Sequence, residues 1–184
     1  MIRIFDILFS FFGLLILSPI IIVLLIIGFF DTGSPIFRQE RVGKNKQPFN
    51  LYKFRSMHFN TKSVATHLAN ASSITPFGRF LRKSKLDELP QLRNVLVGDM
   101  SLVGPRPNLF YQEELIVERD TRGVYNVRPG ITGLAQINKI DMSTPQLLAE
   151  TDAKMINHLN VWYYFKYIFL TVFGKGFGDR IKQS

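Results

Sequence analysis

The pattern of apolar and polar positions divides the chain into an apolar N-terminal segment and a longer mixed segment. Residues 7–30 contain no charged side chain, and such a run is long enough to cross a bilayer as a helix. Residues 36–43 and 49–55 instead alternate apolar and polar positions, with Gly43-Lys44-Asn45-Lys46 between them. This alternation around a turn-forming segment predicts a β-hairpin.

The rest of the chain predicts mainly helices, so the expected fold class is α+β and mostly helical. Thr75-Pro76 predicts a helix start, because proline is well tolerated at the first helical position. Ser84-Lys85-Leu86-Asp87 has the spacing of a capping pattern, which predicts a helix through Val97 that ends at Gly98. Residues 108–121 predict an exposed amphipathic helix rich in Glu, whereas the polar residues 59–75 are expected to form a loop.

A final helix dense in aromatic side chains is predicted over residues 161–173. It is too short to span a membrane and contains Lys166, so it is interpreted as an interfacial helix, since Trp and Tyr favour the headgroup zone. A core helix is the alternative. Gly174-Lys175-Gly176-Phe177-Gly178 only weakly resembles a phosphate loop, because it closes a helix and does not follow a strand.

The apolar N-terminal segment has two forms open to it because Ser18-Pro19 lies near its centre. Proline kinks a helix, and a kink at mid-depth could return the chain to the side it entered from. Many spanning helices also carry a central proline, so a straight spanning helix is equally open. A signal peptide is disfavoured, because no small-residue cleavage site follows Phe30.

Basic residues flank both ends of the apolar run, which favours both ends in the cytoplasm under the positive-inside tendency. Within the first turn, Arg3 and Asp6 have a spacing that lets them pair on one helix face. The flanking basic residues are Arg3 before the run and Arg38, Arg41, Lys44 and Lys46 after it.

Composition narrows the class of partner. The chain has 184 residues, about one domain, and its net charge of +9 indicates an anionic partner such as nucleic acid, a phosphorylated substrate or anionic lipid. It contains no Cys, which excludes disulfides and thiolate metal sites. The histidines His58, His67 and His158 are scattered and lack zinc-ligand spacing.

Asp87 and Glu88 are the candidate catalytic residues. They follow the basic segment Arg82-Lys83-Ser84-Lys85 and precede an apolar run. Adjacent carboxylates among cations suit metal-assisted phosphate chemistry, in which one carboxylate attacks or ligates while the other holds a hard cation. The alternative is that both residues are ordinary acids in the first turn of a helix, where they favour the positive end of its dipole.

Two rigid loops each present one cation. In Gly104-Pro105-Arg106-Pro107, the prolines restrict where the guanidinium can point, which suits bidentate phosphate binding, although a plain turn is the alternative. Arg128-Pro129-Gly130-Ile131-Thr132-Gly133 is a second such loop. In the predicted hairpin, Lys53 and Arg55 are expected on one strand face.

Four blocks of this sequence resemble the monotopic phosphoglycosyl transferases, the bacterial sugar transferase family. They occur in the order and spacing of that family, behind a similar apolar segment, and the resemblance covers nearly the whole chain. The blocks are Tyr52-Lys53-Phe54-Arg55-Ser56-Met57, Leu86-Asp87-Glu88-Leu89-Pro90-Gln91-Leu92, Gly98-Asp99-Met100-Ser101-Leu102-Val103-Gly104-Pro105-Arg106-Pro107 and Arg128-Pro129-Gly130-Ile131-Thr132-Gly133-Leu134-Ala135-Gln136.

The resemblance implies transfer of a sugar-1-phosphate from a UDP-sugar to polyprenyl (undecaprenyl) phosphate, which starts O-antigen, capsule or glycoprotein glycan assembly. Asp87 would be the nucleophile that carries the phosphosugar after UMP leaves, and Glu88 would be the ligand of a Mg²⁺ cofactor. The residues that would bind phosphate are Lys53, Arg82, Arg106 and Arg128.

The resemblance also implies that Ser18-Pro19 breaks a re-entrant membrane helix at residues 1–30. Residues 31–184 would form a catalytic domain on the cytoplasmic face of the bacterial inner membrane, with the bilayer as a partner and no nucleic acid; a homodimer is left open. Two departures from the family pattern, at Lys139-Ile140 and at Tyr164, leave the sugar undetermined.

Two other functions stay open on the residues alone. The first is a membrane-anchored, metal-dependent phosphoester hydrolase in which water is the nucleophile. The second is a non-catalytic module that binds anionic lipid, although carboxylates among the basic residues would weaken such a patch.

Overall fold

The computed structural model describes residues 1–59, 61 and 71–173, and it is mostly helical with a few short strands, as predicted. Most of the predicted loop over 59–75 and the whole of 174–178 lie outside the described residues. The elements are α1 (Ile2–Thr32), β1 (Ile36–Val42), β2 (Pro48–Phe54), α2 (Pro76–Ser84), α3 (Gln91–Val97), β3 (Ser101–Val103), α4 (Glu113–Thr121), β4 (Gly130–Thr132), α5 (Leu134–Ile137), α6 (Pro145–His158) and α7 (Val161–Val172).

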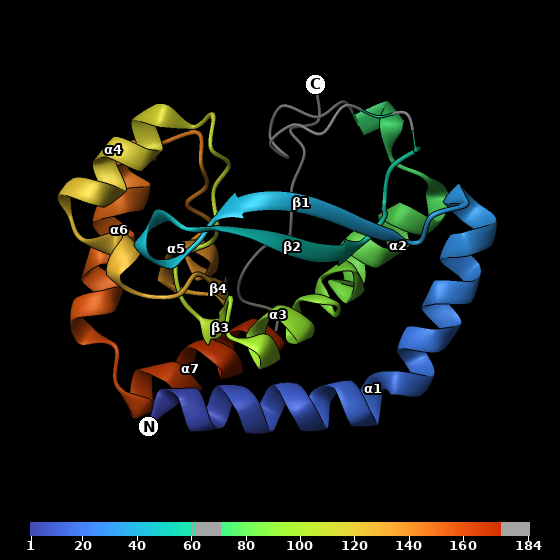
Figure 1. Ribbon diagram of the computed structural model, residues 1–184, viewed down its shortest axis with the longest axis horizontal. Coiled ribbons are helices and arrows are strands. Elements are labelled where there is room, and N and C mark those ends of the chain that lie inside the picture. Colours follow the sequence, from blue (N-terminus) through green and yellow to red (C-terminus); the bar gives the residue numbers. More distant parts are fainter. Residues whose placement is uncertain (60, 62–70, 174–184) are drawn as a thin grey trace.

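The N-terminal helix α1 is long and apolar enough to cross a membrane by length and composition. It runs along the bottom of the molecule in Figure 1 and then turns upward on the right. Pro19 lies inside this helix, and the hydroxyl of Ser18 donates to the carbonyl of Leu15 at 2.8 Å. Because proline removes one helical hydrogen bond and crowds the preceding turn, it accounts for the bend.

The first turns of α1 are fixed to the rest of the fold by two charged side chains. The buried carboxylate of Asp6 accepts hydrogen bonds through Oδ1 from the Ser101 hydroxyl at 3.0 Å, the Leu102 amide at 2.9 Å and the Tyr164 hydroxyl at 2.9 Å. Arg3 instead donates to carbonyls at the end of α3. The predicted pairing of Arg3 with Asp6 is therefore wrong, because each side chain has a better-placed partner outside the helix.

The hydroxyl of Tyr164 is suited to the partner it has, the carboxylate of Asp6. Burial raises the pKa of the Tyr164 phenol, and the neighbouring charge of Asp6 raises it further. The phenol therefore stays protonated and donates a hydrogen bond to Asp6. This bond ties α7 to α1, which lie at opposite ends of the sequence.

The predicted hairpin is confirmed. Strands β1 and β2 pair antiparallel from Ile36 opposite Phe54 to Val42 opposite Pro48. Lys53 lies on the buried face of β2, so the strand directs its ammonium group inward. Arg55 lies beyond the end of β2, where its guanidinium donates to the carbonyls of Ser34 and Ile36.

The helix predicted at Thr75-Pro76 is confirmed, but the capping pattern at Ser84 is not. Thr75 accepts a hydrogen bond from the Gly78 amide at 2.8 Å and so caps α2. Ser84 is the last residue of α2, and the next residue, Lys85, ends the helix with a φ of 60°. A 3₁₀ turn at Leu86–Glu88 follows, and α3 begins only at Gln91; it stops at Gly98, as predicted.

Strand β3 pairs parallel with β4, with Ser101 opposite Gly130 and Val103 opposite Thr132. At this crossing the two backbones approach so closely that a Cβ on Gly130 would lie 2.0 Å from the Gly104 nitrogen. Only glycine permits this approach, and it brings together the two rigid loops that carry Arg106 and Arg128.

Gly130→Ala should therefore destabilise the fold by about 3 kcal/mol or more, because a backbone clash cannot be relieved by a side-chain rotation. Thermal unfolding of the detergent-purified protein would measure this. Gly13→Ala is the matched control, since a Cβ there meets only the flexible tip of Leu92, at 3.3 Å. Equal unfolding temperatures for the two variants would contradict the close approach.

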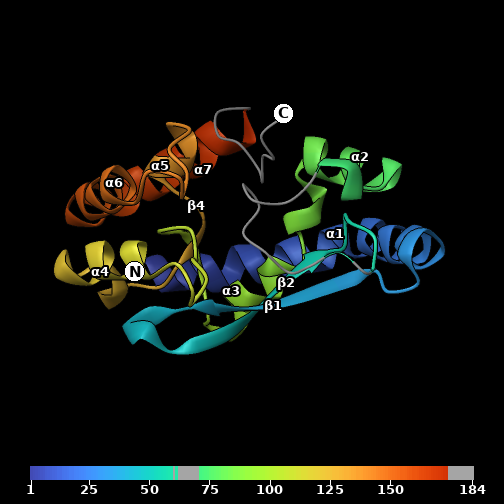
Figure 2. The same cartoon turned by 90° about the horizontal axis from the view of Figure 1, so that it is seen from above.

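Helices α4 and α7 differ in how well the sequence predicted them. The helix expected over 108–121 begins only at Glu113, and it is not fully exposed, because Leu115 and Arg119 are buried. The helix expected over 161–173 is present as α7: Tyr164 and Tyr167 are buried, whereas its other aromatic residues are partly or largely exposed. Seen from above, the hairpin and α7 lie on opposite sides of β4 (Figure 2).

Candidate active site

The two candidate catalytic carboxylates lie in the 3₁₀ turn between α2 and α3. Asp87 is buried, with 3% of its surface exposed. Leu86 and Leu89, on either side of the pair, pack against the core cluster that contains Phe54 and Leu81. These apolar anchors fix the turn, so the carboxylates point from a rigid segment and not from a mobile loop.

Glu88 forms ion pairs with two of the predicted cations. Its Oε1 lies 3.4 Å from Nζ of Lys53 and 3.1 Å from Nη2 of Arg106. The three side chains come from the end of β2, the 3₁₀ turn and the loop after β3. Their exposed fractions are only 9%, 11% and 22% for Lys53, Glu88 and Arg106. In such a poorly solvated site charges interact more strongly than on a surface.

The other two predicted cations lie at different places. Arg82, in the last turn of α2, donates through Nε to the Ser56 hydroxyl at 2.7 Å. Its Nη1 is buried and has no hydrogen-bond partner among the described residues. Arg128 donates through Nε to the carbonyl of Gly98 at 2.8 Å. That contact holds Arg128 at the end of α3, away from the turn at its start that carries Glu88.

The loop that carries Arg106 is held in place through three successive carbonyls. The Gly130 amide donates to Pro105 at 2.8 Å, Arg119 donates to Arg106 at 2.8 Å, and Arg41 donates to Pro107 at 3.1 Å. The donors belong to three separate parts of the chain. The Arg106 guanidinium therefore projects from a backbone that is fixed before any ligand arrives.

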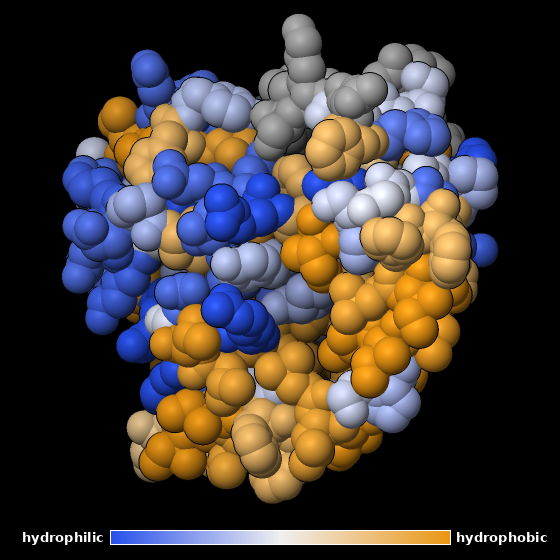
Figure 3. Space-filling view, turned by 45° about the vertical axis from the view of Figure 1, so that its right-hand side comes forward, coloured by the Kyte–Doolittle hydropathy of each residue, from blue (hydrophilic) through white to orange (hydrophobic). Residues whose placement is uncertain are grey.

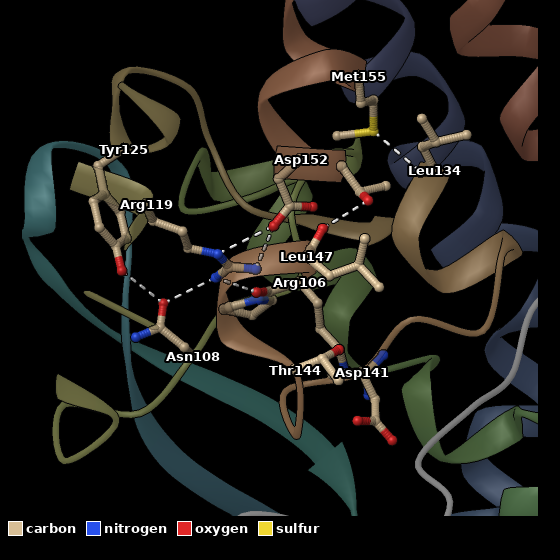
Figure 4. Close-up of polar contacts among 12 residues, drawn as sticks. Arg106, Asn108, Arg119, Tyr125, Leu134, Asp141, Thr144, Leu147, Asp152 and Met155 are labelled. Atoms are coloured by element: carbon tan, nitrogen blue, oxygen red, sulfur yellow. Dashed lines mark hydrogen bonds and ion pairs between the residues drawn. The ribbon is translucent and has the colours of Figure 1, made fainter. Parts of the chain in front are cut away.

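A buried ion pair that sequence reasoning missed supports this loop (Figure 4). Arg119 contacts Oδ2 of Asp152 through Nε at 3.1 Å and Nη2 at 2.7 Å, and both side chains are almost fully buried. Asn108 accepts from Arg119 and from the Tyr125 hydroxyl. Burial raises the pKa of the Asp152 carboxyl, although the charge of Arg119 opposes the rise. No local pattern marks a pair whose members lie 33 residues apart.

Asp152→Asn should lower the free energy of unfolding by about 3–5 kcal/mol, because it leaves the Arg119 charge buried without a countercharge. The apolar double variant Arg119→Met/Asp152→Leu should recover much of that loss. Chemical denaturation would measure both. Asp120→Asn is the control: it breaks an ion pair with Lys46 that is 49% exposed on both sides, which should cost no more than about 1 kcal/mol. Equal losses for Asp152→Asn and Asp120→Asn would contradict this account.

The donor set at the turn fits a Mg²⁺ that is shared with a phosphorylated ligand. In the part of the chain that the structure describes, no group of three or more His, Cys, Asp or Glu side chains could hold a metal by itself. Mg²⁺ commonly uses only one or two carboxylates together with substrate phosphates and water. Both ion pairs of Glu88 use Oε1, so Oε2 is the oxygen that a metal would take.

The structure combines a helix that is long and apolar enough to cross a membrane with a carboxylate and cation site suited to phosphate groups. Comparison with known proteins is more specific. The family described as "Bacterial sugar transferase" matches residues 1–176, so the chain belongs to the bacterial sugar transferase family.

Three relatives illustrate the similarity. The UDP-glucose:undecaprenyl-phosphate glucose-1-phosphate transferase of Escherichia coli is 41% identical over 95% of this chain and 40% of its own length. The uncharacterized sugar transferase EpsL of Bacillus subtilis is 40% identical over 99% of this chain and 90% of its own length. The undecaprenyl-phosphate galactose phosphotransferase of Salmonella typhimurium is 41% identical over 77% of this chain and 34% of its own length. The chain thus spans well under half of the two relatives whose names state a substrate.

Proposed function

We propose that this protein transfers a sugar-1-phosphate from a UDP-sugar to polyprenyl phosphate, with release of UMP. The observation that carries the proposal is the poorly solvated cluster in which Glu88 meets Lys53 and Arg106 beside the buried Asp87. The names of the similar transferases supply the donor class and the lipid acceptor.

In the first step, a carboxylate oxygen of Asp87 attacks the β-phosphorus of the UDP-sugar. The bond from that phosphorus to the bridging oxygen breaks, and UMP leaves with the electron pair. An anionic nucleophile can approach an anionic diphosphate only where positive charge offsets the repulsion. Lys53 and Arg106 supply that charge, and Nη1 of Arg82, which has no partner among the described residues, gives a further donor for a phosphate oxygen.

In the second step, a phosphate oxygen of the polyprenyl phosphate attacks the phosphosugar held on Asp87. The acyl phosphate bond breaks, the Asp87 carboxylate is restored, and polyprenyl diphosphate sugar is released. The covalent intermediate divides one difficult displacement into two easier ones. Mg²⁺, held through Glu88, would neutralise part of the diphosphate charge.

The lipid acceptor requires a membrane surface, and α1 provides an apolar one. Its outer side chains form much of the apolar lower and right-hand surface in Figure 3. The bend at Pro19 and the basic residues on both flanks support a re-entrant helix that enters and leaves on the cytoplasmic face. We place the exposed aromatic residues of α7 at the same interface. These residues are Trp162, Phe165 and Phe169, and Phe173 directly follows the helix.

A panel of UDP-sugars, each incubated with undecaprenyl phosphate and Mg²⁺, tests the proposal by release of UMP. At least one sugar should give UMP and a lipid-linked diphosphate sugar in equal amounts. Rapid formation of free sugar phosphate that does not depend on lipid would instead favour a hydrolase with water as nucleophile. Binding of anionic vesicles without turnover of any UDP-sugar would favour a lipid-binding module.

The re-entrant topology makes a separate prediction. The chain has no Cys, so single cysteines placed at Ile2 and Asn45 can be labelled without background. Both should react with a membrane-impermeant maleimide only from the cytoplasmic side, as should the control Asp120→Cys. Labelling of Ile2→Cys from the opposite side to Asn45→Cys would rule out the re-entrant form and establish a spanning helix.

A further inference from the structure

Gln136 carries a buried amide on the short helix α5. The residue is 8% exposed, and neither its Oε1 nor its Nε2 has a hydrogen-bond partner among the residues that the structure describes. A buried amide that makes no hydrogen bond is unfavourable, so such groups are usually satisfied by water or by a ligand. Within the part of the chain that the structure describes, the amide of Gln136 is therefore available to a ligand.

The amide lies at the base of the loop that carries Arg106. A Cβ built on Gly133 would lie 2.6 Å from the Gly104 carbonyl and 3.0 Å from Oε1 of Gln136. Gly104 is the first residue of the Gly104-Pro105-Arg106-Pro107 loop, and its amide donates to Thr132 at 2.8 Å. Gln136 is thus anchored beside the same backbone that directs Arg106 to Glu88.

The chemistry of a primary amide restricts the ligand it suits. It offers two donors and an acceptor and carries no charge. An isolated phosphate has only acceptors, and the neighbouring cations already match it. Sugar hydroxyls and the imide edge of a uracil both present a donor and an acceptor together, and both belong to a sugar nucleotide.

We propose that Gln136 is a binding residue for the uncharged, donor-and-acceptor part of the sugar nucleotide, either the sugar hydroxyls or the base. This inference rests on the proposed transferase function and adds a contact to it. In this arrangement the cations bind the diphosphate, and the amide distinguishes between the sugars or bases that the diphosphate carries. A site with an unpaired buried amide discriminates well, because a ligand without a matching group leaves that amide unsatisfied.

Gln136→Met tests the proposal, because it keeps the side-chain volume and removes both polar atoms. We expect the KM for the UDP-sugar to rise by about fivefold to tenfold, as for loss of one or two neutral hydrogen bonds. The KM for undecaprenyl phosphate should change less than about twofold. The unfolding temperature should stay equal or rise, because an unpaired amide has been removed from the interior.

Gln136→Glu, which keeps an acceptor but loses both donors, should also raise the KM for the UDP-sugar. Gln146→Met, at an exposed position of α6, is the control.

The outcomes separate this inference from the proposed function. UMP release by the unaltered protein establishes the function independently of Gln136. If both Gln136 variants keep the normal KM for the UDP-sugar, and Gln136→Met unfolds at a lower temperature, then the amide binds an internal water and the proposal is wrong. Weaker inhibition by UMP in Gln136→Met, by the same factor as the KM, would assign the amide to the uridine, through its base or its ribose hydroxyls. Unchanged inhibition by UMP with an altered preference between epimeric sugars would assign it to the sugar.

Discussion

Asp87→Asn should reduce UMP release by at least about 1,000-fold, the scale seen when a nucleophile is removed. An amide has nearly the same shape as a carboxylate but cannot form the acyl phosphate. Leu86 and Leu89 hold the turn through apolar contacts that the substitution does not touch, so we expect it to alter the chemistry more than the fold. Initial rates with a saturating UDP-sugar and undecaprenyl phosphate, together with an unfolding curve, would measure both effects.

Asp120→Asn is the matched control for Asp87→Asn, because Asp120 is a surface carboxylate on α4 paired with Lys46. Its activity should equal that of the unaltered protein. Unchanged, Mg²⁺-dependent UMP release in Asp87→Asn would mean that another group is the nucleophile. The most direct reassignment would then be to water, with the carboxylates acting only as metal ligands.

Glu88→Gln should lower the rate by about 100-fold and raise the Mg²⁺ concentration needed for half-maximal activity by about tenfold to 100-fold. Two effects combine. The neutral amide is a poorer ligand than a carboxylate for a hard cation, and it removes the negative charge that lies 3.4 Å from Lys53 and 3.1 Å from Arg106. Titration of the initial rate with MgCl₂ would measure the change.

Glu118→Gln serves as the control for Glu88→Gln, because Glu118 on α4 pairs with Arg122, the residue that follows the helix. Its Mg²⁺ midpoint should not move. A Glu88→Gln variant with a normal midpoint and a reduced rate would contradict metal binding by Glu88. Its role would then be limited to positioning Lys53 and Arg106.

Features that depend on near neighbours in the chain could be predicted from the sequence. The hairpin follows from alternating residues on either side of Gly43, and the start of α2 from Thr75-Pro76. The stop at Gly98 follows because glycine adopts the left-handed conformation that ends α3, with a φ of 103°. The Ser84 prediction failed for a related reason. Lys85 also adopts the left-handed conformation, which ends α2. Lysine is not a residue type that predicts this conformation, so the helix end could not be seen in the sequence.

Contacts between distant parts of the chain could not be predicted in this way. Asp6 and Tyr164 lie 158 residues apart. Arg119 and Asp152 lie on different helices, and in the sequence each resembles an ordinary charged residue of a helix. Each becomes a buried partner only when the tertiary fold excludes water around it. Gln136 is a further case, because only the structure shows that its amide has no partner among the described residues.

The candidate site falls between these two cases. Residue type and the family resemblance singled out Lys53, Glu88 and Arg106 from the sequence, and the structure brings these three side chains together. Arg128 was singled out on the same grounds but lies at the far end of α3, bonded to Gly98. The pairing of β3 with β4 places the two rigid loops side by side. Their arginines nevertheless contact different ends of α3: Arg106 pairs with Glu88 in the turn before it, and Arg128 bonds to Gly98 after it.

The most direct test of the central claim is an intact mass of the protein after incubation with a UDP-sugar and Mg²⁺ in the absence of any lipid acceptor. A covalent aspartyl phosphosugar predicts a mass increase equal to one sugar phosphate, together with one equivalent of UMP. The adduct should disappear on addition of undecaprenyl phosphate and should not form in Asp87→Asn. An unchanged mass, measured with a UDP-sugar that the protein turns over when lipid is present, would contradict the covalent mechanism.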